Sequence, residues 1–251
     1  LFINLMCLKK QKQMNFKSSL LYTLICCFIV TSSFGQYKSG KITFERKTNL
    51  EKRYGEGSRK WLDEKNRIKT EYFELVFNDT SSLWQVQQTG IPDPMSWGTS
   101  RNLVYRNTKL TTYYSIRDIW GDMIHVVDTL PKRTWKMTSS KRNIAGYDCK
   151  KVFWQVNDTT KIYAWYSEEI IPSIGPERFY GLPGAILGLA SEDGGVVYFA
   201  KKIDLYQPKK EEFDFKRSKK TQTLESTREQ IELVMSRNKY WKTDISHYFL
   251  W

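Results

Sequence analysis

The chain contains few of the residues that bind metals or form disulfide bonds. It has four cysteines and two histidines among 251 residues, and three of the cysteines lie before residue 28. The remaining Cys149 cannot form an intramolecular disulfide, so it is either a small buried apolar residue or a reactive thiol. His125 and His247 are far apart, and neither is spaced from another His or Cys as zinc ligands are. The sequence therefore predicts no metal site, no cofactor and no disulfide.

Motifs of known catalytic classes are absent as well. The chain has no G-x-S-x-G elbow of the serine hydrolases and no D-x-D-x-D-G loop for calcium. Cys149 and His125 could form a nucleophilic pair only if the fold brought them together. Glycoside hydrolysis needs two carboxylates at a suitable separation, for which Glu168, Glu169 and Glu177 are available, although most proteins offer such groups. These observations favour a protein that is not an enzyme, with an envelope glycan hydrolase using paired carboxylates as an alternative.

Long apolar runs are scarce, and the clearest one lies near the N-terminus. Lys17 precedes an apolar stretch at Leu20–Val30 of about 11 residues, well short of the roughly 20 that a membrane-spanning helix needs. Ser33 and Gly35 then occupy the −3 and −1 positions of a cleavage site before Gln36. A basic start, a short apolar core and a small-x-small exit are typical of a secretory signal peptide.

This pattern predicts three regions in the chain. Residues 1–13 are interpreted as sequence upstream of the true start at Met14, residues 14–35 as the signal peptide, and residues 36–251 as a single β-rich domain. An uncleaved anchor and a lipoprotein modified at Cys26 or Cys27 are the alternatives. We expect the mature chain to be exported to the periplasm and not to span the membrane.

Acidic residues are outnumbered by basic ones. The full chain has 40 Lys and Arg against 27 Asp and Glu, a net charge of +13, and removal of the four lysines in residues 1–35 leaves +9. In an exported protein this excess favours anionic envelope surfaces or anionic ligands as partners, and no nucleic acid is expected. Simply solvated lysines are the plainer alternative.

The mature chain is dominated by β-strand patterns. The stretch "KITFERKT" alternates, which places Ile42 and Phe44 on one face of a strand. Turn-forming stretches at 156–161 and 192–195 predict hairpins. About ten strands with short connections predict a mainly β (α+β) fold, in the form of a curved antiparallel sheet or half-barrel. The other expected strands are Ile68–Asp79, Leu83–Gln87, Asn102–Tyr105, Thr111–Ile116, Met123–Asp128, Lys150–Val156, Ile162–Ser167, Ala185–Ala190 and Val196–Ile203.

One helix is expected near the C-terminus. Ser226 and Glu229 have the spacing of a capping box, and an apolar stripe follows them to about residue 238. We expect this stripe to pack on the sheet. The lysine-rich segment 209–220 is interpreted as a solvated linker that leads into the helix. The stripe consists of Ile231, Val234 and Met235.

Aromatic residues make up 15% of the chain and supply the candidate binding residues. Trp97 lies in a long loop at Thr89–Ser100, and long loops in compact domains are often functional. The strands Val152–Val156 and Ile162–Tyr166 are apolar on both faces and need two coverings, which an apolar ligand or the C-terminal helix could provide. If these rings do not simply form the core, the candidate ligand contacts are Trp97, Trp154, Tyr163 and Trp165.

The segment "IPSIGPERFYGLPGAILGL" can be interpreted from local rules. Pro176 suits the first position of a helical turn, and Gly181 suits a left-handed exit from it. Leu182 precedes a proline and is expected to be extended. Pro183 and Gly184 fit the two central positions of a type II turn, whose second residue needs a positive φ. We therefore interpret these four residues, from Gly181 to Gly184, as a structural motif.

Several of these stretches resemble the GLPGLI family of exported bacterial proteins, which is named for its hexapeptide. The resemblance rests on "GPERFYGLPGAILGL", "VYFAKKI", "NIAGYDCKKVFW" and "YAWYSEEIIPSIGP". Ala185 stands where the family name has leucine. The family has no assigned activity, and its strand order looks similar to that of lipoprotein-carrier-like envelope proteins. That likeness implies a curved sheet wrapped around helices, with an apolar concave face.

Three functions are compatible with these observations. The favoured one is an exported, non-enzymatic cell-envelope protein that binds an apolar or amphipathic ligand, such as a lipid, in the hollow of a curved sheet. The second is an accessory subunit that interacts with an outer-membrane protein complex, and the third is the envelope glycan hydrolase.

Overall fold

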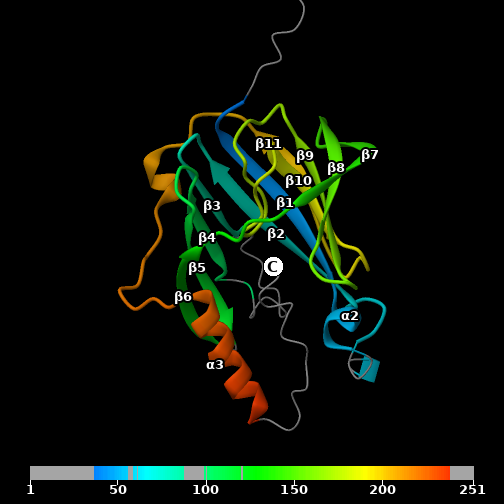
Figure 1. The fold of residues 1–251 in the computed structure, drawn as a ribbon, viewed down its shortest axis with the longest axis vertical. Helices are drawn as coiled ribbons and strands as arrows, with labels where there is room; N and C mark the ends of the chain where they lie inside the picture. Colours follow the sequence, from blue (N-terminus) through cyan, green and yellow to red (C-terminus); the bar gives the residue numbers. More distant parts are fainter. Residues whose placement is uncertain are drawn as a thin grey trace, which may run out of the picture. The chain divides into compact units, whose positions relative to one another are not determined.

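One antiparallel sheet dominates the computed structural model (Figure 1). The structure describes residues 37–55, 59–60, 62–87, 99, 101–119 and 121–237. The expected signal peptide, Trp97 and His247 fall outside this part of the chain. Within it the sheet has 11 strands. They are β1 Gly40–Asn49, β2 Ile68–Phe77, β3 Ser81–Val86, β4 Leu103–Asn107, β5 Thr112–Ile119, β6 Asp122–Thr129, β7 Trp135–Ile144, β8 Tyr147–Gln155, β9 Lys161–Ser167, β10 Ala185–Ser191 and β11 Val196–Asp204.

The sheet is open and consists of two meanders. Its strand order is β6-β5-β4-β3-β2-β1-β11-β10-β9-β8-β7, so β6 and β7 form the edges. Strands β1 to β6 are neighbours in sequence and in space, as are β7 to β11, and the antiparallel pairing of β1 with β11 joins the two groups. This topology confirms the expected mainly β fold, and the hairpins at β8–β9 and β10–β11 lie where the turn signals placed them.

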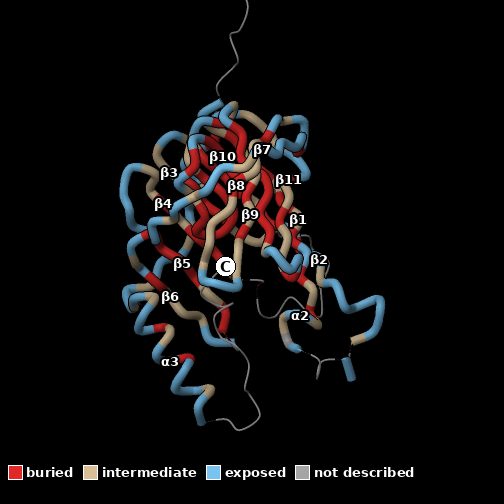
Figure 2. The backbone as a smooth tube through the Cα atoms, turned by 45° about the vertical axis from the view of Figure 1, so that its right-hand side comes forward, coloured by how far each residue is buried: buried red, intermediate tan, exposed pale blue. Residues whose placement is uncertain are grey.

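The strand alternation creates an inner face that carries the core. On β1 the even-numbered residues Ile42, Phe44, Arg46 and Thr48 are all buried, while the residues between them are partly or fully exposed. Phe73 on β2 pairs with Phe44, and its ring stacks on that of Trp84 at 4.9 Å. Full burial of each such apolar side chain contributes about 1.5–3 kcal/mol to folding. Figure 2 shows the buried residues gathered along these strands.

A long connection between β9 and β10 also belongs to this core. Ile170, Ile174, Phe179 and Leu182 are buried in one apolar cluster with residues of the inner face, such as Val152 on β8. The segment 168–184 therefore covers part of the face that the sequence predicted to hold an apolar ligand. The C-terminal helix does not provide this covering, because it packs against β6 at the sheet edge.

The outer face is covered over β3 to β5 by the segment that follows β11. Phe213 and Phe215 pack against a second buried cluster of Leu83, Leu103 and Tyr114. Phe213 ends a short 3-10 helix, η3 Lys210–Phe213. Segment 209–220 is mostly exposed and leads toward helix α3, as predicted, but it is not wholly solvated, because its two phenylalanines alternate with charged residues and anchor it to the sheet.

The helices differ in detail from the sequence prediction. Helix α3 spans Leu224–Ser236, and its N-cap is Thr223, whose side chain accepts a hydrogen bond from the Ser226 backbone. The expected capping box at Ser226 is therefore displaced, because a second hydroxyl residue three positions earlier caps the helix. Ile231 is buried, but Val234 is exposed, so the expected stripe is only partly packed. A short helix, α2 Leu50–Tyr54, was not expected.

No helix within the described residues has the length and apolarity required to cross a bilayer.

Candidate functional site

The Gly-Leu-Pro-Gly motif has a different local geometry from the predicted one. The Phe179 backbone N–H donates to the Pro176 carbonyl at 3.0 Å and closes a tight turn. This turn replaces the helical turn that was predicted to begin at Pro176. The Gly184 N–H donates to the Leu182 carbonyl at 2.8 Å, so a γ-turn centred on Pro183 replaces the expected type II turn. The predicted positive φ holds for both glycines, with 92° at Gly181 and 147° at Gly184.

Steric contact explains why a glycine is required at 184. A Cβ atom added there would overlap the carbonyl oxygen of Ser167 and lie 3.0 Å from the Glu168 Cα, both at the end of β9. A glycine at 184 thus lets the chain pass tightly beside the end of β9, and the interpretation of the whole motif as structural remains a prediction.

The turn before this motif contains one of the two non-glycine residues of the described chain that have a positive φ. Glu177 has a φ of 54° and is only 2% exposed. A left-handed conformation is uncommon for residues other than glycine and costs about 1–3 kcal/mol, so it persists only where the surroundings enforce it. At Glu177 the left-handed backbone conformation is held by buried polar side chains that contact its carboxylate.

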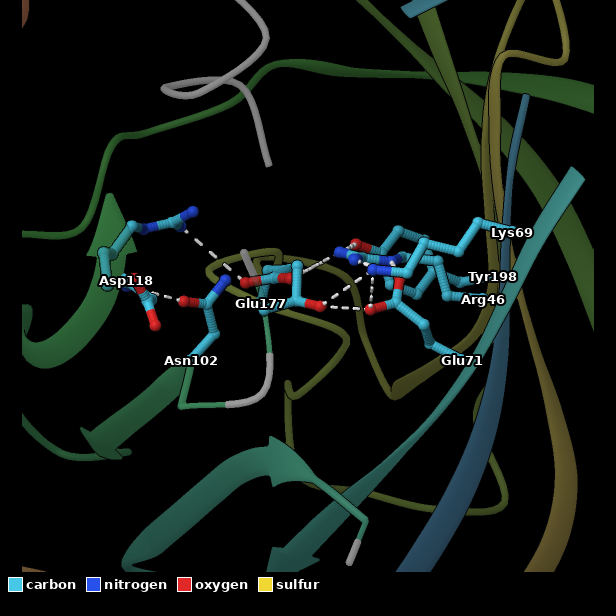
Figure 3. A network of polar contacts seen from close by, with 9 residues as sticks. Arg46, Lys69, Glu71, Asn102, Asp118, Glu177 and Tyr198 are labelled. Atoms are coloured by element: carbon cyan, nitrogen blue, oxygen red, sulfur yellow. Dashed lines mark hydrogen bonds and ion pairs between the residues drawn. The ribbon is translucent and has the colours of Figure 1, made fainter. Parts of the chain in front are cut away.

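Glu177 joins a network of buried charges on the inner face (Figure 3). Its Oε1 accepts a hydrogen bond from the Tyr198 hydroxyl at 3.2 Å and lies 3.7 Å from Nη1 of Arg46. Its Oε2 lies 3.7 Å from Nη2 of Arg117 on β5. The connection between β9 and β10 is thereby tied to β1, β5 and β11 through one carboxylate.

Glu71 forms the other half of the network. Its Oε2 accepts hydrogen bonds from Nε and Nη2 of Arg46 at 3.0 Å and 2.5 Å. Its Oε1 lies 2.9 Å from Nζ of Lys69 and accepts a short hydrogen bond from the Thr99 hydroxyl. Burial alone would raise the pKa of Glu71, but the charges of Arg46 and Lys69 outweigh it and lower the pKa to about 2.

Arg46 is the centre of the network because it contacts both carboxylates. Burial acts to lower the pKa of Arg46, but Tyr198, Glu71 and Glu177 raise it overall. Burial raises the pKa of the Tyr198 hydroxyl, which remains protonated and donates to Glu177. The aromatic ring of Phe73 packs against the Arg46 guanidinium, with 4.8 Å between Cζ and the ring centroid.

This geometry does not suit the paired-carboxylate hydrolysis considered from the sequence. A glycosidase needs one carboxylic acid that is protonated near neutral pH. Glu71 is ionised there, and both Glu71 and Glu177 are held by Arg46. Glu168 instead lies at the surface in an ion pair with Lys150 at 2.7 Å. The arrangement is suited to fixing the 176–184 segment in place.

The predicted binding residues fall on opposite faces of the sheet. Trp154 faces inward, with its ring 6.4 Å from that of Phe179. Tyr163 and Trp165 face outward and are partly exposed. Trp97 lies outside the described residues. Tyr163 and Trp165 therefore lie on the outward face and Trp154 in the inner packing, and a ligand contact by any of them remains a prediction.

Tyr163 and Trp165 belong to an outward surface in which aromatic rings alternate with cations. The Lys151 ammonium lies 4.1 Å from the Tyr163 ring centroid and 5.4 Å from that of Trp165. Trp165 in turn packs against Phe199 at 5.4 Å, and the Arg142 guanidinium lies 4.5 Å from the Phe199 ring. We call this surface the aromatic–cation face, and it comprises Lys136, Arg142, Lys151, Phe153, Tyr163, Trp165 and Phe199.

Gly188 permits this packing. It pairs with Trp165 on one side and Phe199 on the other. A Cβ atom at Gly188 would lie 2.7 Å from Cε1 of Phe199, so any side chain there would push the Phe199 ring away.

Cys149 and His125 do not form a catalytic pair. The Cys149 thiol is buried and contacts the Tyr147 carbonyl, and burial raises its pKa to about 12. His125 Nδ1 instead shares a hydrogen bond of 2.8 Å with the Tyr114 hydroxyl. No group of three or more His, Cys, Asp or Glu side chains suited to a metal ion occurs in the described part of the chain.

Comparison with solved structures bears on the fold. The chain is similar to the solved structure of PNGF-II in its P21 and C2 crystal forms, with a TM-score of 0.55 and 14% and 15% identity. The alignments cover 79% of this chain and 34% and 33% of those proteins, so the chain spans about a third of their length. At this identity the likeness shows a shared β-rich fold alone. No curated protein matches the chain.

The match to a family model covers the strands around the Gly-Leu-Pro-Gly motif. It does not confirm the GLPGLI name that the motif suggested. Residues 153–188, from β8 to the middle of β10, match a family described as "Protein of unknown function (Porph_ging)".

Proposed function

We propose that the protein is an exported, non-enzymatic cell-envelope protein that binds an anionic, amphipathic ligand, namely a lipid surface, through the aromatic–cation face. The expected periplasmic location, the cleavage before Gln36 and the likeness to lipoprotein-carrier-like proteins belong to the same proposal. The single observation that carries it is the position of the Lys151 ammonium over both the Tyr163 and Trp165 rings on an outward face.

The chemistry of this face matches a lipid headgroup region. Partly exposed aromatic rings are favoured at the boundary between apolar and aqueous phases, because one part of the ring system is apolar and the other part tolerates water. Lysine and arginine near an anionic membrane surface each contribute about 1 kcal/mol of attraction. Lys136, Arg142 and Lys151 supply three such cations beside four rings.

The inner face is a poorer candidate for the ligand. Phe179 and Ile174 from the 168–184 connection already pack against the inner strands. This moves the proposed contact from the hollow of the sheet, where the sequence placed it, to the outward surface of β8, β9 and β11.

Binding to lipid vesicles tests the proposal. Wild-type protein is expected to co-sediment with vesicles of phosphatidylglycerol and phosphatidylcholine, and much less with phosphatidylcholine alone. Lys151→Gln is expected to weaken binding about fivefold, consistent with about 1 kcal/mol per cation, and Trp165→Ala to weaken it further. Lys219→Gln removes an exposed charge away from this face and serves as the matched control. Equal binding by Lys151→Gln and the control would refute the role of this face.

Export has its own test. The proposal expects the protein in the periplasmic fraction with Gln36 as its first residue, as read by intact mass or N-terminal sequencing. A first residue at Cys26 or Cys27 carrying lipid, or a chain retaining the Leu20–Val30 stretch in the membrane fraction, would replace this assignment with a lipoprotein or an anchored protein.

A further inference from the structure

Arg106 is buried on the inner face of the sheet, and no carboxylate of the described residues forms an ion pair with it. It lies on β4 and is 4% exposed. One of its nitrogens, Nη2, donates to the Ser173 carbonyl at 3.3 Å, and its guanidinium lies 4.7 Å from the Tyr180 ring centroid. Its other two nitrogens, Nε and Nη1, are buried and make no hydrogen bond within the described part of the chain.

Arg133 stands beside it. Its Nη1 donates to the Arg178 carbonyl at 2.9 Å, and its guanidinium lies 4.2 Å from the Phe179 ring and 5.1 Å from the Trp154 ring. Nε of Arg133 is buried and has no hydrogen-bond partner among the residues that the structure describes. Arg106 and Arg133 thus both contact the 173–180 segment, and both leave donors unused.

The electrostatic surroundings of these two arginines are unfavourable within the described chain. Burial lowers the pKa of Arg106 to about 10, and burial with the positive charges of Arg178 and Arg106 lowers the pKa of Arg133 to about 9. Both side chains remain cationic at neutral pH. Neither forms an ion pair with a carboxylate of the described residues, in contrast to Arg117, which lies 3.7 Å from Glu177.

Buried guanidinium groups with unused donors cost folding free energy unless an anion compensates them. The planar guanidinium presents its N–H groups in a fork that fits the oxygens of carboxylate, sulfate or phosphate. The rings of Tyr180 at Arg106, and of Phe179 and Trp154 at Arg133, add cation–π contacts to the two guanidinium groups.

We propose that Arg106 and Arg133 form a binding site for a small oxyanion, or for the oxyanion group of a larger ligand. The site is independent of the aromatic–cation face, because it lies on the inner side of the sheet and shares none of its residues. Ser173 and Tyr180 position Arg106, and Phe179 positions Arg133.

Thermal unfolding of the full chain in different sodium salts tests this site. Phosphate, sulfate and acetate are titrated against chloride at matched ionic strength. For a site whose Kd is about tenfold below the anion concentration, the expected rise in Tm is about 3–6 °C. A rise with phosphate and sulfate only identifies a tetrahedral oxyanion as the ligand group, and a rise with acetate only identifies a carboxylate.

Arg106→Met and Arg133→Met are expected to abolish this rise. In chloride alone they should unfold at or above the wild-type temperature, because Arg106→Met removes a buried charge and Arg133→Met a partly buried charge, neither paired with a described carboxylate. Lys132→Gln removes the exposed cation next to Arg133 and should respond to anions as the wild type does.

Three results would overturn the site. The first is a wild-type Tm that does not depend on the anion at fixed ionic strength, and the second is an unchanged response in both methionine variants. If neither variant folds, calorimetric titration of the wild type with inorganic phosphate decides: saturable binding at one site supports the proposal, and no binding refutes it. None of these results bears on vesicle binding, so the two proposals fail separately.

Discussion

Replacement of Glu71 by glutamine tests the buried charge network most directly. The Glu71 carboxylate is held by Arg46, Lys69 and the Thr99 hydroxyl, and the residue is 7% exposed. Glu71→Gln keeps the shape but leaves two buried cations facing a neutral amide. Removal of one member of a buried ion pair is strongly destabilising, because the remaining charge stays buried without compensation.

The magnitude follows from the pKa. Folding lowers the pKa of Glu71 from 4.5 to about 2. One pKa unit corresponds to about 1.4 kcal/mol, so the ionised carboxylate stabilises the fold by about 3 kcal/mol at pH 7. Because the folded pKa lies below the unfolded one, this contribution is complete above about pH 4.5 and is lost as the pH falls toward 2.

Urea unfolding followed by tryptophan fluorescence measures both effects. The free energy of unfolding of Glu71→Gln should lie about 3 kcal/mol below that of the wild type at pH 7, and the gap should narrow progressively between pH 4.5 and pH 2.5. Glu168→Gln removes one partner of an exposed ion pair and should remain close to the wild type. A gap of the same size at pH 7 and pH 2.5, or no gap at pH 7, would refute the reasoning.

Three further predictions concern stability and reactivity. Gly184→Ala should lower the free energy of unfolding by about 2 kcal/mol or more, because of its positive φ and the overlap with Ser167. Gly181→Ala should cost only about 1 kcal/mol, because its Cβ would make an ordinary contact of 3.7 Å with Trp135 Nε1, and equal costs would contradict the steric account. Tyr198→Phe should cost about 1–2 kcal/mol in urea unfolding, because the Glu177 carboxylate loses a buried donor, and an unchanged midpoint would show that this hydrogen bond contributes nothing. Iodoacetamide at pH 8 should label Cys149 only after unfolding, as followed by peptide mass mapping, and rapid native labelling would show that the thiol is accessible.

The strand pattern was largely predictable because alternation of apolar and polar residues reports burial directly. The expected strands at Ile68–Asp79 and Ile162–Ser167 coincide with β2 and β9 within two residues. Strand β7 was missed because most of its residues are exposed, so "WKMTSSKRNI" carries no alternating signal. The helix start was misplaced because Thr223 and Ser226 are both suitable caps.

The charge network was harder to predict because its members come from distant parts of the chain. One signal was available: the alternation that placed Ile42 and Phe44 on the buried face places Arg46 there too. A buried arginine requires an anionic partner, but nothing local identifies Glu71 or Glu177 as that partner. Glu177 was considered as a carboxylate for hydrolysis and not as a partner of Arg46, because its left-handed φ has no sequence signature.

The pairing of β1 with β11 has a consequence for how the chain folds. Arg46 and Tyr198 lie on these two strands, 152 residues apart in sequence, and β1 cannot acquire its second neighbour until the last strand is available. Contacts of such long range slow folding, because the loop entropy is lost before the contact forms. Until then β1 is the unpaired edge of the first meander, exposed to association with other chains. Lys41 and Lys47 on that strand oppose such association before β11 pairs, whereas in the folded sheet both sides of β1 are already paired.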